Sequence, residues 1–262
     1  MTQSISFDRA ADYYDDTRAL PDNIAQKQAD TLVAEIERAG AARVLEVGIG
    51  TGRIARPLAA RGVRVSGIDI STRMMARLRE QVEPPFAPID LLLGDATRLP
   101  VTTASVRAVL VVHVLHLVSS WQDSVAEIAR VLEPGGILLR AREEYPDPNP
   151  WRETYAKWIE LERARGFQRR PRPSDEGIAE RLRALGASLR TEVYAQDEAR
   201  WTPAENIEST RKRIDSWTWQ FPDDLFAELL AEFEPWVKER FSDMDKEYVQ
   251  PRSFEIDVWT FP

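Results

Sequence analysis

The sequence predicts an α/β protein with a mostly parallel sheet, on three observations. Strand-like and helix-like segments alternate between Arg43 and Glu144, which is typical of βαβ units. The run 106–112 is apolar on both faces, as a central parallel strand should be. Three glycines directly follow the first strand. The predicted strands of this part are Arg43–Val47, Val63–Ile68, Ile89–Leu93, Val106–Val112 and Ile137–Ala141.

The segments between these strands carry apolar residues at helical spacing. One helix is predicted from about Thr51 to Ala60. Ser71 is typical of a helix N-cap, and an amphipathic segment follows it. Another helix is predicted from Trp121. The residues Pro134-Gly135-Gly136 predict a tight turn into the fifth strand.

After Glu144 the pattern changes. Residues 144–173 are rich in proline and predict an insertion that holds one helix, at about Trp151–Arg163. Residues 203–241 are predicted to be helical again. The remaining predicted elements are a helix capped by Ser174, a strand at 188–195 and a last strand over Phe254–Trp259.

Composition limits the classes of function. The net charge of −8 argues against a general nucleic-acid binder, which needs a basic face. The absence of cysteine excludes disulfides, thiolate nucleophiles and cysteine-bound zinc, and with two histidines we expect no metal site. The polar, acidic N-terminus does not resemble a secretory signal, and no apolar run is long enough to span a membrane. We therefore expect a cytoplasmic enzyme.

The stretch VLEVGIGTGRIARPLA predicts where a cofactor binds. A short apolar strand meets Gly48, Gly50 and Gly52, and a helical pattern follows at once. A strand that turns through glycine into a helix lets the backbone approach a ligand and directs N–H groups at it. A dinucleotide fingerprint would have its third glycine at Arg53, which disfavours a dehydrogenase. The alternative to a cofactor loop is a plain βα turn.

The pattern E-x-G-x-G-x-G, which begins at Glu46, resembles motif I of the class I S-adenosylmethionine (SAM)-dependent methyltransferases, particularly the small-molecule type. Three later stretches are also similar to this family: LLLGDATRLP, VLVVHVLHLV and ARVLEPGGILL. The resemblance covers roughly residues 7–141. It implies a Rossmann-like sheet of seven strands in the order 3-2-1-4-5-7-6 with the last strand antiparallel, and helical insertions that form a substrate cap.

The resemblance also assigns residues to the cofactor. It implies that Asp69 accepts hydrogen bonds from the ribose hydroxyls, which suits an acceptor-only carboxylate. It implies that Asp95 and Ala96 contact the adenine, and that the backbone at His113 meets the methionine end of SAM. The amides and dipole of the glycine loop suit the SAM carboxylate.

Other residues carry two interpretations. Tyr14 and Arg18, in the N-terminal segment FDRAADYYDDTR, either reach the SAM carboxylate or belong to a segment packed on the core. Glu46 either accepts from the SAM ammonium or stabilises the loop through backbone N–H groups. We expect Arg53 to face solvent or to stand behind the site.

The organisation implied is threefold. Residues 1–42 form a helical segment over the cofactor, residues 43–143 form the SAM-binding core, and residues 144–262 complete the sheet with cap insertions at 144–173 and 203–241. The many tryptophans after residue 144 either pack helices or cover an apolar acceptor. The arginines of segment 163–172 either grip an anion or lie in solvent.

His113 and His116 are the candidate catalytic residues, because histidine exchanges protons near neutral pH and both follow the fourth strand. The alternative is that they only pack or hydrogen-bond in their loop. We expect transfer of a methyl group from SAM to a small-molecule acceptor, with S-adenosylhomocysteine (SAH) as product. The alternatives are an RNA or protein methyltransferase and a SAM-binding protein without turnover. The sequence indicates neither the acceptor nor the oligomeric state.

Overall fold

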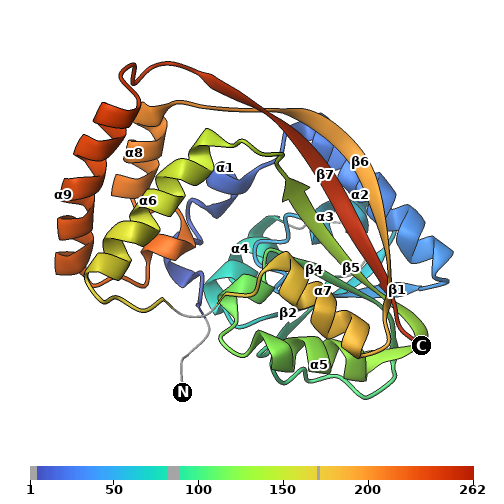
Figure 1. Cartoon of the computed structure of the whole chain (residues 1–262). Coiled ribbons are helices and arrows are strands. Elements are labelled where there is room, and N and C mark those ends of the chain that lie inside the picture. The colour runs from blue at the N-terminus through green and yellow to red at the C-terminus, as the bar shows by residue number, and fades with distance from the viewer. Residues whose placement is uncertain (1–4, 82–88, 170–171) are drawn as a thin grey trace. The chain divides into compact units, whose positions relative to one another are not determined.

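The computed structural model describes residues 5–81, 89–169 and 172–262, and these contain a seven-stranded sheet in the order β3-β2-β1-β4-β5-β7-β6 (Figure 1). Strands β1 to β5 are parallel to their neighbours. The N–H of Gly135, near the start of β5, donates to the carbonyl of Phe261 beyond the end of β7, so β7 is antiparallel. The predicted strand order is therefore confirmed. The strands are β1 (Arg43–Val47), β2 (Arg64–Asp69), β3 (Ile89–Leu93), β4 (Val106–Val112), β5 (Leu132–Glu144), β6 (Ser188–Trp201) and β7 (Tyr248–Thr260).

Helices cover both faces of this sheet. Helices α2, α3 and α4 share one hydrophobic cluster, and α5 and α7 share another. Successive side chains of a strand point to opposite faces. In β1, Leu45 and Val47 therefore pack on the side of α5, whereas Val44 packs on the side of α2 and Glu46 faces the same way. The helices of this part are α1 (Tyr14–Arg18), α2 (Asp22–Arg38), α3 (Ala55–Ala60), α4 (Thr72–Gln81), α5 (Trp121–Val131) and α7 (Asp175–Ala184), with the 3-10 turns η1 (Asp8–Ala10) and η2 (Leu115–Leu117).

The chain divides into two compact units. The first comprises Met1–Glu143, Arg172–Ala195 and Phe254–Pro262 and contains the parallel strands with their helices. The second comprises Glu144–Pro171 and Gln196–Ser253, where most of the two predicted insertions lie. Its helices are α6 (Pro150–Ala164), α8 (Pro203–Arg211) and α9 (Asp223–Arg240), with the 3-10 turn η3 (Ser216–Thr218).

An aromatic core holds the second unit together. Trp158 of α6 is fully buried, and its ring centroid lies between 5.2 and 5.9 Å from the rings of Trp217, Phe221, Phe226 and Phe233. Most of the tryptophans after residue 144 thus pack on one another and on the helices. That this unit covers a methyl acceptor remains a prediction.

Two arginines of the segment 163–172 are paired with acids. Arg165 forms ion pairs with Glu228 and Glu232, and Arg169 with Glu162, which is 2% exposed. Arg170 lies outside the described residues, as do residues 1–4 of the predicted N-terminal segment. The charges of Arg165 and Arg169 are therefore already balanced within the unit.

Several element boundaries differ from the prediction. The expected turn at Pro134-Gly135-Gly136 is part of β5, because Gly135 and Gly136 exchange backbone hydrogen bonds with Phe261. The strand predicted at 188–195 continues to Trp201, and the last strand begins at Tyr248. These extensions depend on pairing with distant strands, which a local sequence pattern does not show. Helix α3 begins only at Ala55.

Within the described ranges, no helix is both long enough and apolar enough to cross a bilayer.

We predict that Trp158→Ala destabilises the second unit by about 3–5 kcal/mol, because it removes a fully buried ring and leaves a cavity. Urea unfolding monitored by fluorescence measures the change. Trp151→Ala is the matched control, since Trp151 is 42% exposed and should cost about 1 kcal/mol or less. Equal losses in the two variants would contradict the packing described here.

Candidate functional site

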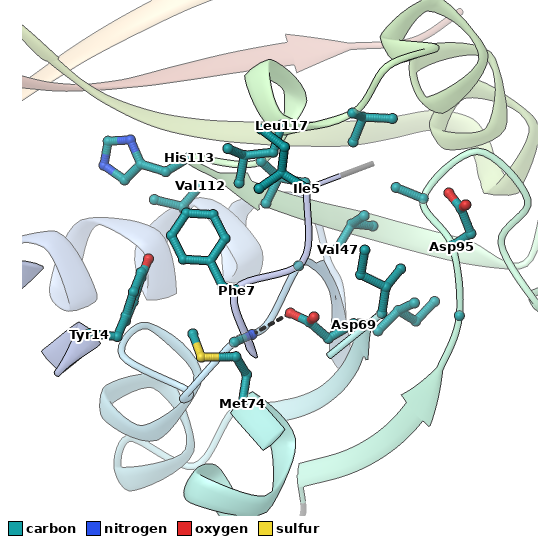
Figure 2. Close-up of a pocket in the computed structure, with 18 residues that line it drawn as sticks. Ile5, Phe7, Tyr14, Val47, Asp69, Met74, Asp95, Val112, His113 and Leu117 are labelled. Atoms are coloured by element: carbon teal, nitrogen blue, oxygen red, sulfur yellow. Dashed lines mark hydrogen bonds between the residues drawn. The ribbon is translucent and has the colours of Figure 1, made fainter. Parts of the chain in front are cut away.

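A cavity of about 660 Å³, including space open to solvent, lies at the carboxyl ends of the parallel strands (Figure 2). Ligands of open α/β sheets bind at this edge. Its walls come from β1, β2, β4, the turn after β3 and the N-terminal segment. The residues that carry the argument below are Ile5, Phe7, Tyr14, Gly48, Gly50, Asp69, Asp95, Ala96 and His113.

The glycine loop between β1 and α3 forms one wall. Gly48 and Gly52 have φ values of +77° and +75°, which favour glycine. A Cβ on Gly48 would overlap the side chain of Val114, and one on Gly52 would overlap Leu78. Close packing therefore requires glycine at both positions, independent of any ligand.

The N–H groups of this loop already have acceptors. Gly48 and Ile49 donate to the carbonyl of Ile68, and Gly52 donates to that of Ile49. Gly50 donates to the Asp69 carboxylate at 2.8 Å. The expectation that these amides receive a ligand carboxylate therefore loses most of its basis, and α3 is too short to add a strong dipole.

Asp69, at the end of β2, connects the loop to α4. Its Oδ2 accepts from the Gly50 N–H (Figure 2). Its Oδ1 accepts from the Ser71 N–H at 2.8 Å. Ser71 caps α4 as predicted, with its hydroxyl accepting from the Met74 N–H. Burial raises the pKa of Asp69, although these N–H groups oppose the rise. Each carboxylate oxygen retains acceptor capacity toward the cavity.

Asp95 and Ala96 line the far end of the cavity. Asp95 is exposed, and its Oδ1 accepts from the backbone N–H and the hydroxyl of Thr97. Ala96 is buried. The sequence predictions thus place Asp69, Asp95 and Ala96 correctly around one cavity, while their contacts with a cofactor stay predictions.

The N-terminal segment crosses the cavity. Ile5 donates its N–H to the carbonyl of Leu117, and Phe7 packs edge-on against Tyr14 with centroids 5.6 Å apart (Figure 2). Burial raises the pKa of the Tyr14 hydroxyl. Arg18 does not line the cavity, so of the two predicted residues only Tyr14 does.

Acidic side chains fasten this segment to the first unit. Asp8 accepts from the Ser71 hydroxyl at 2.5 Å, and Asp15 accepts from the Thr51 hydroxyl at 2.5 Å. Asp12 forms ion pairs with Arg73 and Arg77 of α4. These contacts form what we call the acidic clasp, which consists of Asp8, Asp12 and Asp15.

Glu46 is 2% exposed, and its Oε2 has no hydrogen-bond partner among the described residues. Burial raises its pKa to about 8, while the nearby charge of Arg53 opposes the rise. No backbone N–H of the described loop donates to Glu46. The carboxylate that stabilises the loop is that of Asp69 instead. A buried acceptor without a partner fits a site for a cationic group.

The two histidines differ in position. His113 follows β4 with φ of +55° and lines the cavity. Desolvation and then the charge of Arg53 lower its pKa, so its imidazole is neutral at pH 7. His116 lines no described cavity, and desolvation, with Arg172 nearby, lowers its pKa to about 3. The structure thus brings only His113 to the cavity.

Arg53 is half-buried and does not line the cavity, so of its two expected positions it takes the one behind the site. Its charge acts on Glu46, Tyr14 and His113. Sequence reasoning missed Phe7 and Met74 as lining residues.

Residues 45–140 match the family model described as "Methyltransferase domain". They contain most of β1, the strands β2 to β4, most of β5 and the glycine loop that lines the cavity. Over these residues the chain is similar to methyltransferase domains. The family resemblance seen in the sequence is therefore confirmed.

A curated relative of the methyltransferase domain is the demethylmenaquinone methyltransferase of Renibacterium salmoninarum, 35% identical over 117 residues, which are 45% of this chain and 48% of that protein. The chain spans between 25% and 57% of the length of the first three curated relatives it matches.

Solved structures share the fold. A protein of Bacillus halodurans C-125 matches with a TM-score of 0.57 and 20% identity, covering 87% of this chain and 98% of that chain. The [4+2]-cyclase SpnF matches with a TM-score of 0.54 and 20% identity, covering 94% of this chain and 83% of its own. At such identities the likeness shows the fold alone, and a fold hosts several activities.

We predict that Glu46 makes stability fall as pH rises. A carboxyl group whose folded pKa, about 8, exceeds its unfolded value of about 4.5 favours the folded state most below pH 4.5, and this contribution is lost up to about pH 8. Glu46→Gln should therefore melt higher than wild type at pH 8, by a margin that shrinks toward pH 5. A margin independent of pH, measured by differential scanning calorimetry, would contradict a buried carboxyl group.

Proposed function

We propose that this protein transfers a methyl group from SAM to a small-molecule acceptor. The observation that carries the proposal is the shared cavity of the glycine loop, Asp69 and Asp95, inside a segment that matches the methyltransferase family. In this arrangement Asp69 accepts from the ribose hydroxyls and Asp95 from the adenine amino group. Ala96 offers its backbone N–H to the ring.

The residues present fit a sulfonium nucleoside with an amino acid end. The unpartnered Oε2 of Glu46 is a buried acceptor for an ammonium group. When bound, SAM supplies an activated methyl group: the acceptor forms the new bond to carbon, the C–S electron pair goes to sulfur, and SAH is left.

The protein's part is to orient the reactants and exclude water. Phe7 and Tyr14 place aromatic surface along the cavity, and Ile5 holds the segment to Leu117. A base is needed only where the acceptor must lose a proton in the transition state. The neutral imidazole of His113 suits that task. His116 lines no described cavity and is too weak a base at pH 7.

A small molecule is the proposed acceptor for two reasons. The net charge of −8 opposes nucleic acid, and Arg165 and Arg169 are already ion-paired. The demethylmenaquinone methyltransferase among the relatives acts, by its name, on a quinone precursor, which agrees with a small acceptor.

We predict that Asp95→Asn weakens SAH binding about tenfold, because an amide NH₂ replaces one acceptor oxygen opposite the adenine amino group. The remaining amide oxygen can still accept from Thr97, so the melting temperature without ligand should not change. Titration calorimetry measures the affinity. Asp90→Ala is the control, because Asp90 is exposed and lies outside the cavity. If wild-type protein binds neither SAM nor SAH, the proposed function is wrong.

We predict that His113→Asn lowers methyl transfer at least tenfold while SAH affinity changes less than threefold, because a general base contributes about 10²–10⁴ to rate. Asparagine tolerates the positive φ at this position, so the backbone is preserved. Transfer of tritium from labelled SAM into small-molecule extract fractions measures the rate. His116→Asn serves as the matched variant. An unchanged rate in His113→Asn would remove the proposed role.

A further inference from the structure

Strand β3 lies at one end of the sheet and, among the described residues, has a neighbouring strand on one side only. Two of its residues are exposed leucines: Leu92 is 42% exposed and Leu93 is 61% exposed. The hydrophobic cluster under α5 and α7 reaches β2 at Ile68 but does not include Leu92, which borders a hollow open to solvent. The described part of the chain therefore leaves this apolar strand partly uncovered.

The backbone of β3 also has groups that the sheet does not use. The N–H of Gly94, directly after the strand, donates to the Asp69 carbonyl of β2. Since the backbone groups of successive residues point to opposite sides of a strand, those of Leu91 and Leu93 point away from β2. An unpaired strand edge of this kind is a template on which another strand can pair.

The two outer strands of the sheet differ in their protection against such pairing. Natural edge strands are protected by charged side chains, proline or a bulge. The outer strand β6 carries charges such as Arg190 and Glu192 and is mostly exposed. Strand β3 has the sequence IDLLL, in which Asp90 is the single charge. The composition of β6 thus suits a free edge, whereas that of β3 suits a covered one.

We propose that β3 pairs with β3 of a second copy of this chain, in antiparallel orientation about a twofold axis. A twofold contact is self-complementary, so one surface supplies both sides. Two registers bring the outward groups of Leu91 opposite an outward-facing leucine, which is either Leu91 or Leu93 of the second copy. The first register would place Asp90 beside Leu92 of the second copy. The second places Leu92 beside its own equivalent and Asp90 beside Gly94, so it pairs leucine with leucine and is the register we propose.

The charges near β3 agree with the antiparallel orientation. This orientation brings Asp90, near the start of one strand, toward the far end of the other, where Arg98 forms an isolated bridge with Asp95. Arg98 is exposed, and in the described ranges it has no ion pair. Asp90 contacts Arg43 at 3.5 Å, but both side chains are more than 50% exposed, so this pair is weak. The twofold axis repeats the contact between Asp90 and Arg98, and two ion pairs therefore flank the leucines.

The association should be weak because the paired strands are short. Stable interfaces bury about 1,200–2,000 Å², and a contact at the low end of this range corresponds to a Kd of about 10–100 µM. Sedimentation velocity between about 1 and 300 µM protein should therefore show a monomer that converts to a dimer. A chain that stays monomeric over this whole range would overturn the proposal.

Cross-linking tests the register. The chain contains no cysteine, so one substitution introduces a single thiol. Oxidation with copper phenanthroline should convert Leu92→Cys into a covalent dimer, because residue 92 faces its own equivalent at a separation that suits a disulfide. Leu93→Cys is the matched control: it is an exposed leucine of the same strand but faces Leu91 of the second copy, so it should cross-link at least about tenfold more slowly. Equal rates in the two variants, or no covalent dimer, would contradict the proposed pairing.

Charge reversal tests the orientation. Asp90→Lys and Arg98→Glu should each weaken self-association at least about tenfold, because like charges then meet at both ends of the contact. An equimolar mixture of the two variants should associate as wild type does, since opposite charges meet again. Glu192→Lys on β6 is the control, with a half-exposed side chain at the other edge of the sheet, and should leave the association unchanged.

Melting curves of each variant, within a few degrees of wild type, show that a loss of association is not a loss of folding. If the mixture does not recover the association, the antiparallel pairing is wrong. The pairing does not involve the cofactor, so its failure would leave the proposed function untouched.

Discussion

The two hydrogen bonds of the Asp69 carboxylate are the constraint on which the site depends. One fixes Gly50 of the loop and the other fixes Ser71 at the start of α4, so a single side chain sets the spacing between β1, β2 and α4. The positive φ values of Gly48 and Gly52 are compatible with this path only without a Cβ. The cavity is therefore shaped by the protein's own bonds before any ligand arrives.

Much of this arrangement could be predicted from sequence because it is local. The glycine loop, the Ser71 cap and the buried run of β4 each follow from a few adjacent residues. Seven strands in a fixed order, however, came from the family resemblance rather than from periodicity. The strand character of Gly135 and the length of β7 depend on partners more than a hundred residues apart, which no local pattern records.

The site was harder to predict because its charges act across the fold. Glu46 and Asp69 are both acids at strand ends, yet only Asp69 bonds the loop, and Glu46 is buried without a partner. That difference comes from the direction each side chain takes, which depends on the packing of two faces. Arg53 likewise can be recognised as part of the site's surroundings only when the ends of β4 and β5 are placed beside it.

The acidic clasp affects how readily a ligand enters and leaves the cavity. Asp12 and its arginine partners are more than 40% exposed, so dissolved ions weaken their attraction over a Debye length of about 8–10 Å. The N-terminal segment is thus held in place partly by ion pairs whose strength depends on ionic strength. We expect a bound nucleoside to exchange faster at high salt concentration. The buried hydrogen bonds of the glycine loop should be almost insensitive to salt.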